Sequence, residues 1–120
     1  MATFDRDTLK RLHDTQEIAI RTGKHPDKAV TTWVAVAGEE VFVRSVRGPS
    51  GRWYRDLATG GPAELEFAGH RLAVQAIPAN DEAAIGQASR EYLRKYKTSP
   101  YAKAMVKAET LPTTLRLTPR

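Results

Sequence analysis

The sequence predicts an α+β protein, mainly β, in which six antiparallel strands form a small barrel with peripheral helices. Two segments, residues 30–46 and 63–76, each contain two runs of β-branched or alternating residues around a two-residue turn, which is typical of β-hairpins. A last alternating segment follows at residues 114–118. Meandering hairpins bordered by helices close most readily as a small antiparallel barrel.

The whole chain, residues 1–120, fits one domain, because globular domains cluster around 100–150 residues. Hydrophobic residues make up 41% and charged residues 28% of the chain, so it has the composition of a protein with a buried core. So small a core leaves little room for a deep internal cavity. We therefore expect a ligand site in a groove or between two copies of the chain.

The chain has no cysteine, which excludes disulfides, thiolate metal sites and a cysteine nucleophile. The first ten residues contain no apolar run, so we expect no signal peptide. No segment approaches the roughly 18 apolar residues that a membrane-spanning helix needs. We expect a cytoplasmic protein with no membrane partner.

The N-terminal part predicts one helix and one strand. Asp5 is predicted to cap a short helix that ends near His13, because leucines recur there at helical spacing. Residues 17–21 alternate, with isoleucines on one face, and predict the first strand. Residues 22–27 carry the glycine and proline of a turn.

The first hairpin comprises residues 30–37 and 40–46, joined by Gly38-Glu39, and its first strand bears on the oligomeric state. Neither face of its first strand bears a charge. A strand that is apolar on both faces is expected to be covered on both faces. In a chain of this size we expect a second subunit to provide the second cover, which predicts a homodimer.

The middle of the chain predicts a short helix and the second hairpin. Residues 52–57 are expected to be helical, with Ser50 as the N-cap. The second hairpin turns at Ala68-Gly69, and its apolar residues alternate with polar ones on both sides of that turn.

The last third of the chain predicts two helices and the sixth strand. Asn80 or Asp81 is expected to cap the longer helix, and Ser99 with the following proline is expected to start a shorter one. The apolar stripe of the longer helix is predicted to comprise Ile85, Ala88, Tyr92 and Tyr96, supported by Leu93. Residues 114–118 alternate and predict the closing strand.

The net charge of +5 and the pI of about 9.7 raise the question of nucleic-acid binding. Residues 90–107 carry six basic residues and one acid, which is typical of a solvated helix face. The basic residues interleave with few aromatic ones, so we expect no nucleic-acid partner. Residues 41–55 differ, because four arginines and no acid predict a local anion site.

Catalytic and metal-binding motifs are missing. His13, His25 and His70 have no metal-ligand spacing, so no metal site is expected. There is no nucleophile elbow, and Gly23-Lys24 lacks the other residues of a phosphate-binding loop. The sequence assigns no residue a catalytic role.

The candidate site is the run of residues 43–55, in which a strand end, a glycine-containing loop and a helix start follow one another. Arginines hold phosphate or carboxylate groups in a bidentate manner, and Trp53 and Tyr54 offer flat surfaces to a planar ring. Alternatively, Ser50 is only a cap, Trp53 only a core residue and the arginines only surface charge. Four arginines without an acid repel one another, which favours a small anionic or planar ligand.

The most distinctive motifs of the chain are Thr32-Trp33-Val34, Val41-Phe42-Val43-Arg44-Ser45, Trp53-Tyr54-Arg55, Tyr92 and Tyr96, and residues 113–120. In these motifs the chain resembles a bacterial family numbered 2255 among the domains of unknown function. The resemblance extends over nearly the whole chain and implies no activity.

Thr22-Gly23-Lys24 precedes the first hairpin, and residues 48–57 form a glycine loop that leads to a Trp-Tyr helix. In these two places the chain is more distantly similar to the deazaflavin-dependent nitroreductase family, although the turn after Gly23 lacks the Arg-Lys-Ser-Gly pattern of that family. It implies a split β-barrel of the FMN-binding kind, with FMN or a deazaflavin beside the barrel, often at a dimer interface. It also implies an oxidoreductase that transfers hydride through this cofactor.

Together, the residues and the resemblance predict a cofactor site. Its members are Lys24, Thr32, Trp33, Arg44, Ser45, Arg47, Arg52, Trp53, Tyr54 and Arg55. Arg44, Ser45, Arg47 and the loop before Arg52 would bind the phosphate, and Lys24 or Arg55 would place positive charge near the ring. The alternative is a non-catalytic module of the same fold that binds a small molecule or a protein.

Overall fold

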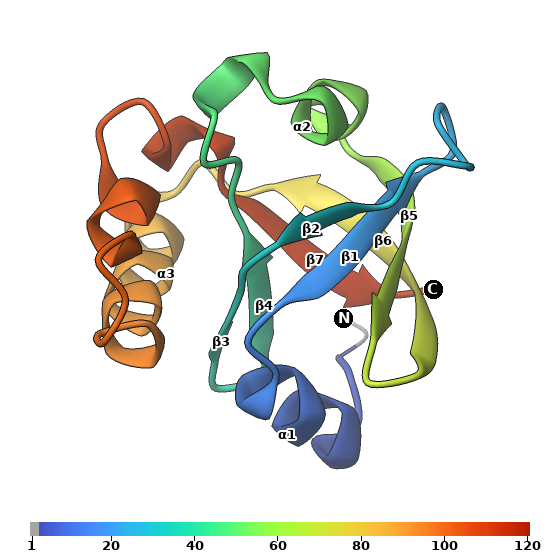
Figure 1. Ribbon diagram of the computed structural model, residues 1–120, viewed down its shortest axis with the longest axis horizontal. Coiled ribbons are helices and arrows are strands. Elements are labelled where there is room, and N and C mark those ends of the chain that lie inside the picture. The colour runs from blue at the N-terminus through green and yellow to red at the C-terminus, as the bar shows by residue number, and fades with distance from the viewer. Residues whose placement is uncertain (1–2) are drawn as a thin grey trace.

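The computed structural model describes residues 3–120 and contains one antiparallel sheet that curls into a barrel (Figure 1). Its strands are β1 (Ile18–Thr22), β2 (Val30–Thr32), β3 (Val34–Ala37), β4 (Glu40–Val43), β5 (Gly61–Phe67), β6 (His70–Pro78) and β7 (Leu115–Pro119). Their order in the sheet is β2-β1-β5-β6-β7-β4-β3. Because the two edge strands, β2 and β3, follow one another in the chain, the sheet closes on itself.

Within residues 3–120, three helices surround the barrel. They are α1 (Arg6–Asp14), α2 (Arg52–Leu57) and α3 (Glu82–Lys95), and short 3₁₀ turns occupy Gly48–Ser50, Ala102–Val106 and Leu111–Thr113. In Figure 1, α1 and α2 lie at opposite ends of the barrel, and α3 packs beside β3. The α+β barrel with peripheral helices that the sequence predicts is confirmed.

The main core fills the barrel. Alternate residues of the strands point inward, as Ile18 and Ile20 do in β1 and Leu115 and Leu117 do in β7. Leu12 of α1 contributes to this core from one helix and Leu57 of α2 from another, and both are buried. The period of two that the sequence shows in these strands therefore reflects their burial.

A second apolar cluster lies between α3 and the outer face of the β3–β4 hairpin. Ala35 and Phe42 pack there against Ala88 and Tyr92, and all four residues are completely buried. The outer face of the doubly apolar strand is thus covered by a helix of the same chain. The homodimer stays a prediction, but this strand gives no reason for a second subunit.

The structure divides the strand expected over residues 30–37 at Trp33. Thr32 pairs with Ile18 of β1, whereas Val34 pairs with Val43 of β4. This break accounts for the difference between the six predicted strands and the seven observed. The strand changes its pairing partner at the bend, and this change closes the barrel.

Side chains of α3 bind the backbone at this bend. The Tyr92 hydroxyl donates to the Trp33 carbonyl at 3.0 Å, and the Lys95 ammonium donates to the Val34 carbonyl at 2.9 Å. Tyr96 accepts the Val34 N–H at 3.3 Å. Because buried backbone groups need partners, Tyr92, Lys95 and Tyr96 replace the ladder bonds that the strand loses where it bends.

Two predicted helix caps are confirmed. Asp5 accepts the Thr8 N–H at 2.7 Å, and Asp81 accepts the Ala84 N–H at 3.1 Å. These bonds satisfy N–H groups that the first turn of a helix leaves without a helical partner.

Other local expectations were wrong. Gly51 occupies the N-cap of α2, because Ser50 ends the preceding 3₁₀ turn and its hydroxyl donates to the Arg47 carbonyl instead. Ser99 precedes a 3₁₀ turn rather than an α-helix. In α3, Leu93 is 42% exposed, and Ala84 is buried where Ile85 was expected.

None of the helices in residues 3–120 combines the length and the apolar composition required to cross a membrane.

Candidate functional site

Three arginines line a pocket between β2 and the loop that leads into α2. The pocket, here called the arginine pocket, has a volume of about 530 Å³. Arg47, Arg52 and Arg55 are exposed at its rim, and no acidic residue contributes to its lining. None of the three forms an ion pair within residues 3–120. The arginine pocket therefore has a positive charge that the described residues do not neutralise.

The floor of the arginine pocket contains Ser45, which is 2% exposed. Its N–H donates to the Thr113 hydroxyl at 3.0 Å, and its carbonyl accepts the Gly48 N–H at 2.9 Å. The backbone of Ser45 is thus fixed, whereas its hydroxyl has no hydrogen-bond partner among the described residues. Gly51 lies so close that a Cβ there would overlap with Ser45 Oγ. Glycine at this position lets the loop approach the strand end.

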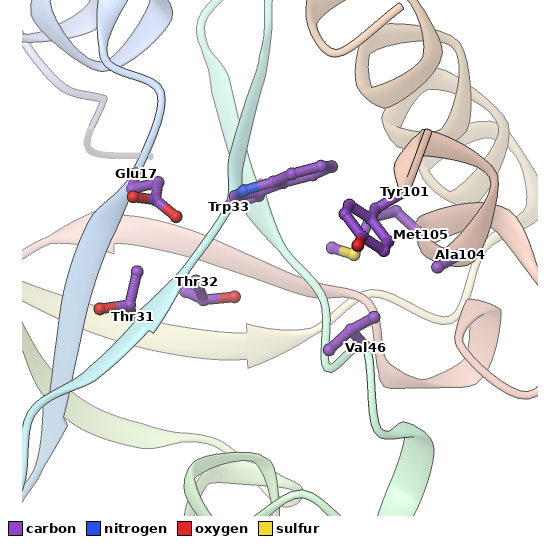
Figure 2. Close-up of a pocket in the computed structure, with 8 residues that line it drawn as sticks. All are labelled: Glu17, Thr31, Thr32, Trp33, Val46, Tyr101, Ala104 and Met105. Atoms are coloured by element: carbon purple, nitrogen blue, oxygen red, sulfur yellow. The ribbon is translucent and has the colours of Figure 1, made fainter. Parts of the chain in front are cut away.

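An apolar pocket of about 320 Å³, here called the aromatic slot, lies next to the arginine pocket. Figure 2 shows its lining: Thr31 and Thr32 of β2 on one side, Tyr101, Ala104 and Met105 on the other, with Trp33, Val46 and Glu17 at its borders. Tyr101 is 71% exposed and Val46 is 50% exposed. Exposed apolar residues of this size at the rim of a pocket are typical of ligand sites.

Trp33 is held rigidly in the wall of the slot. Its indole ring stacks on the Tyr96 ring with 3.9 Å between the centroids and 4° between the planes. The Tyr96 hydroxyl donates to the Gln16 carbonyl at 2.6 Å. Burial raises the pKa of Tyr96 to about 12, so this hydroxyl stays protonated at neutral pH. The wall is therefore already in place without a ligand.

The slot and the arginine pocket adjoin one another, because Thr31, Thr32 and Val46 line both, and together they are called the groove here. One part of the groove is apolar and bordered by aromatic rings, and the other part is basic. This arrangement suits a ligand that combines a flat ring with an anionic group.

Arg44 does not reach the groove, contrary to its expected role in binding phosphate. Its side chain is completely buried between β4 and α3. The guanidinium donates to Thr114 Oγ1 at 2.8 Å, Ser89 Oγ at 2.9 Å, the Met105 carbonyl at 2.9 Å and the Ile85 carbonyl at 2.8 Å. Burial lowers the pKa of Arg44. All four partners are uncharged protein atoms, and they belong to α3 and to the segment that follows it. Arg44 therefore joins these parts of the chain to the barrel.

Lys24 and Tyr54 also lie outside the lining of the groove. Lys24 is exposed on the turn between β1 and β2, and the Tyr54 hydroxyl faces the Pro112 carbonyl at 3.5 Å. Trp53 lines the arginine pocket but is only 7% exposed and belongs mainly to the core. The structure thus brings seven predicted residues to one groove, namely Thr32, Trp33, Ser45, Arg47, Arg52, Trp53 and Arg55.

Several groove residues were not expected from the sequence. Tyr101 and Met105 come from the 3₁₀ segment after α3, more than 50 positions beyond β2 in the chain. Glu17 belongs to a segment that was interpreted only as a strand, and Thr31 and Val46 adjoin predicted site residues without being named among them. No local pattern marks these residues, because they meet only when the C-terminal segment packs against the first hairpin.

Metal-ligating residues do not gather here. In the described part of the chain, no three residues of the types His, Cys, Asp and Glu lie close enough to share a metal ion.

Solved structures show the same fold at low sequence identity. A conserved hypothetical protein of Mycobacterium tuberculosis, Rv2991, has a TM-score of 0.65 with 9% identity, and the match covers 99% of this chain and 82% of that chain. A putative general stress protein 26 of Jannaschia sp. CCS1 has a TM-score of 0.67 with 12% identity, over 94% of this chain and 71% of that chain. The flavocytochrome Anf3 of Azotobacter vinelandii has a TM-score of 0.59 with 17% identity, over 97% of this chain and 63% of that chain.

The closed antiparallel sheet, the bent closing strand and these likenesses define a split β-barrel protein. Residues 8–117 match the family described as "Uncharacterized protein conserved in bacteria (DUF2255)", and the chain belongs to this family. No curated protein matches the chain. The family resemblance inferred from the sequence is therefore confirmed.

Proposed function

We propose that the groove binds a phosphorylated planar cofactor of the flavin class, FMN or a deazaflavin, and that the protein is an oxidoreductase. The observation that carries this proposal is that the arginine pocket lies next to the aromatic slot, with Thr31, Thr32 and Val46 lining both. A phosphate and a flat ring joined by a short chain need two such sites side by side.

The arginine pocket has the chemistry of a phosphate site. Arg47, Arg52 and Arg55 donate charge-assisted hydrogen bonds when an anion enters, and such bonds are about twice as strong as neutral ones. The Ser45 hydroxyl on the floor provides a further donor. The arginine pocket of about 530 Å³ falls within the roughly 300–1,000 Å³ of small-molecule sites.

The aromatic slot suits the ring. Trp33, Val46, Tyr101 and Met105 provide apolar and aromatic walls, and Thr31 and Thr32 provide hydroxyl groups on the side of β2. The cofactor supplies hydride transfer, for which amino-acid side chains have no equivalent. The residues of the chain bind and orient it, and the slot excludes water from one side of the ring.

The fold gives independent support, because a flavocytochrome is among the proteins with the same barrel. The alternative is a barrel that binds a small molecule or a protein without redox chemistry. A groove filled by its own tryptophans would favour that alternative. Instead, Trp33 is stacked on Tyr96 and Trp53 is buried in the core, and the groove between them is open to a ligand.

The test is a fluorescence titration with FMN, with riboflavin and with a phosphorylated deazaflavin. We expect saturable binding of FMN or the deazaflavin, and binding of riboflavin at least about 10-fold weaker, because riboflavin lacks the phosphate. Arg52→Ala is expected to weaken FMN binding about 10-fold and to leave riboflavin binding unchanged. Arg90→Ala is the matched control, since Arg90 is exposed on α3 and does not line the groove.

Failure of the wild-type protein to bind either phosphorylated ligand would overturn the proposal and leave the binding-module alternative. Equal affinity for FMN and riboflavin would show that the arginine pocket does not hold the phosphate.

A further inference from the structure

Glu17 is the one charged residue among those that line the aromatic slot. It lies between α1 and β1 and is exposed to solvent. Figure 2 shows its carboxylate on the side of the slot opposite Tyr101 and near Trp33. A carboxylate beside an apolar slot provides a strong hydrogen-bond acceptor where the other walls provide mainly packing.

The carboxylate of Glu17 is free to act on a ligand. Asp7, Asp14 and Asp56 each pair with a basic side chain of the protein, whereas Glu17 is not part of any ion pair in residues 3–120. The negative charge of Glu17 acts electrostatically on Tyr96, on which Trp33 of the slot is stacked. Burial is the main cause of the raised pKa of Tyr96, and the negative charge of Glu17 raises it further.

The groove therefore has opposite charges at its two ends. Arg47, Arg52 and Arg55 line the basic end, Glu17 lines the slot, and the residues shared between the two parts are uncharged. A ligand with an anion at one end and a hydrogen-bond donor at the other end complements both. A ring that presents an anion or only carbonyl oxygens toward Glu17 would be repelled.

We propose that Glu17 is a specificity residue that accepts a hydrogen bond from a ring N–H at the end of the ligand remote from the phosphate. The inference rests on the proposed function and names the edge of the ring that enters the slot. In flavins and deazaflavins that edge carries the N3–H group. The preferred ligands are then phosphorylated planar rings with an N–H donor at this edge.

The test compares FMN with its N3-methyl analogue, which keeps the phosphate and the ring but lacks this donor. We expect the wild-type protein to bind FMN at least about 10-fold more tightly than N3-methyl FMN, since a hydrogen bond to a charged group is lost. Glu17→Ala is expected to weaken FMN binding about 10-fold and to bring the two ligands within about twofold of one another. Glu39→Ala is the matched control, because Glu39 is an exposed glutamate in the β3–β4 turn and lines neither part of the groove.

Each outcome separates this inference from the proposed function. Undiminished binding of FMN to Glu17→Ala would overturn the role of Glu17 and leave the proposed function intact. A wild-type protein that binds neither FMN nor the phosphorylated deazaflavin would overturn both. Because Glu17 is exposed, its variant is expected to fold, which the far-ultraviolet circular dichroism spectrum checks.

Discussion

Replacement of Arg44 by methionine separates a structural role of this residue from a role in ligand binding. Methionine has a similar length and fills the same space without the guanidinium. Arg44→Met removes four hydrogen bonds and the contact of the guanidinium with the Tyr92 ring, whose centroid is 5.6 Å from Arg44 Cζ. In the variant, the four atoms that accepted these bonds have no guanidinium to bind and remain in a mostly buried region.

The expected loss of stability follows from those acceptors. The Met105 carbonyl loses a donor that methionine does not replace, whereas the Ile85 carbonyl lies within α3 and keeps its helical hydrogen bond. An orphaned buried acceptor costs about 1–3 kcal/mol. The hydroxyl of Thr114 retains its own bond to the Leu111 carbonyl, and removal of a buried charge offsets part of the loss. We therefore expect Arg44→Met to lower the free energy of unfolding by about 3 kcal/mol.

Urea unfolding followed by tryptophan fluorescence measures this loss. For a denaturant slope of about 1–3 kcal/mol/M, the midpoint should fall by roughly 1 M or more with the slope unchanged. Arg90→Met, an exposed arginine of α3, should stay within about 0.5 kcal/mol of the wild type. A midpoint for Arg44→Met equal to that of the wild type would refute the structural role of Arg44.

Two further predictions concern the floor of the arginine pocket and the bend at Trp33. Gly51→Ala should destabilise the protein by about 1–3 kcal/mol in urea unfolding, because the new Cβ overlaps with Ser45 Oγ. Ser45→Ala in the same chain should restore most of that loss, and a double variant no more stable than Gly51→Ala would contradict this explanation. Burial lowers the pKa of Lys95 to about 8, so between pH 8 and the ordinary lysine pKa the unfolded chain binds more protons than the folded one. Stability should therefore rise with pH from about 8 to 9.5 in the wild type, and a Lys95→Met variant with the same rise would exclude Lys95 as its origin.

The regular parts of the fold could be predicted from the sequence because their signals are local. Alternating residues define β5 and β6, and Asp5 and Asp81 define helix starts. The bend at Trp33 could not be predicted, since both faces of that segment are apolar and no glycine or proline marks a break. The bend depends on the hydroxyl groups of Tyr92 and Tyr96, about 60 positions later in the chain.

The candidate site could be predicted only in part, and Arg44 shows why. Side chains of a strand alternate between its two faces, so Arg44 points to the same side as Phe42, which packs against α3. Arg44 is close in sequence to Arg47 and Arg52, which suggested that the three share a site. The alternation instead turns the Arg44 side chain toward α3. Tyr101 belongs to the groove only through tertiary packing, which no pattern around residue 101 reveals.

A nuclear magnetic resonance titration of the protein with FMN shows whether the groove holds the cofactor. The chain has two tryptophans, so two indole N–H signals report on the groove and can be assigned by single substitution. We expect saturable shifts of the Trp33 indole signal and of the backbone amides of Thr31, Ser45 and Val46, which line the groove. Saturable shifts confined to other surfaces, with these signals unchanged, would contradict this expectation.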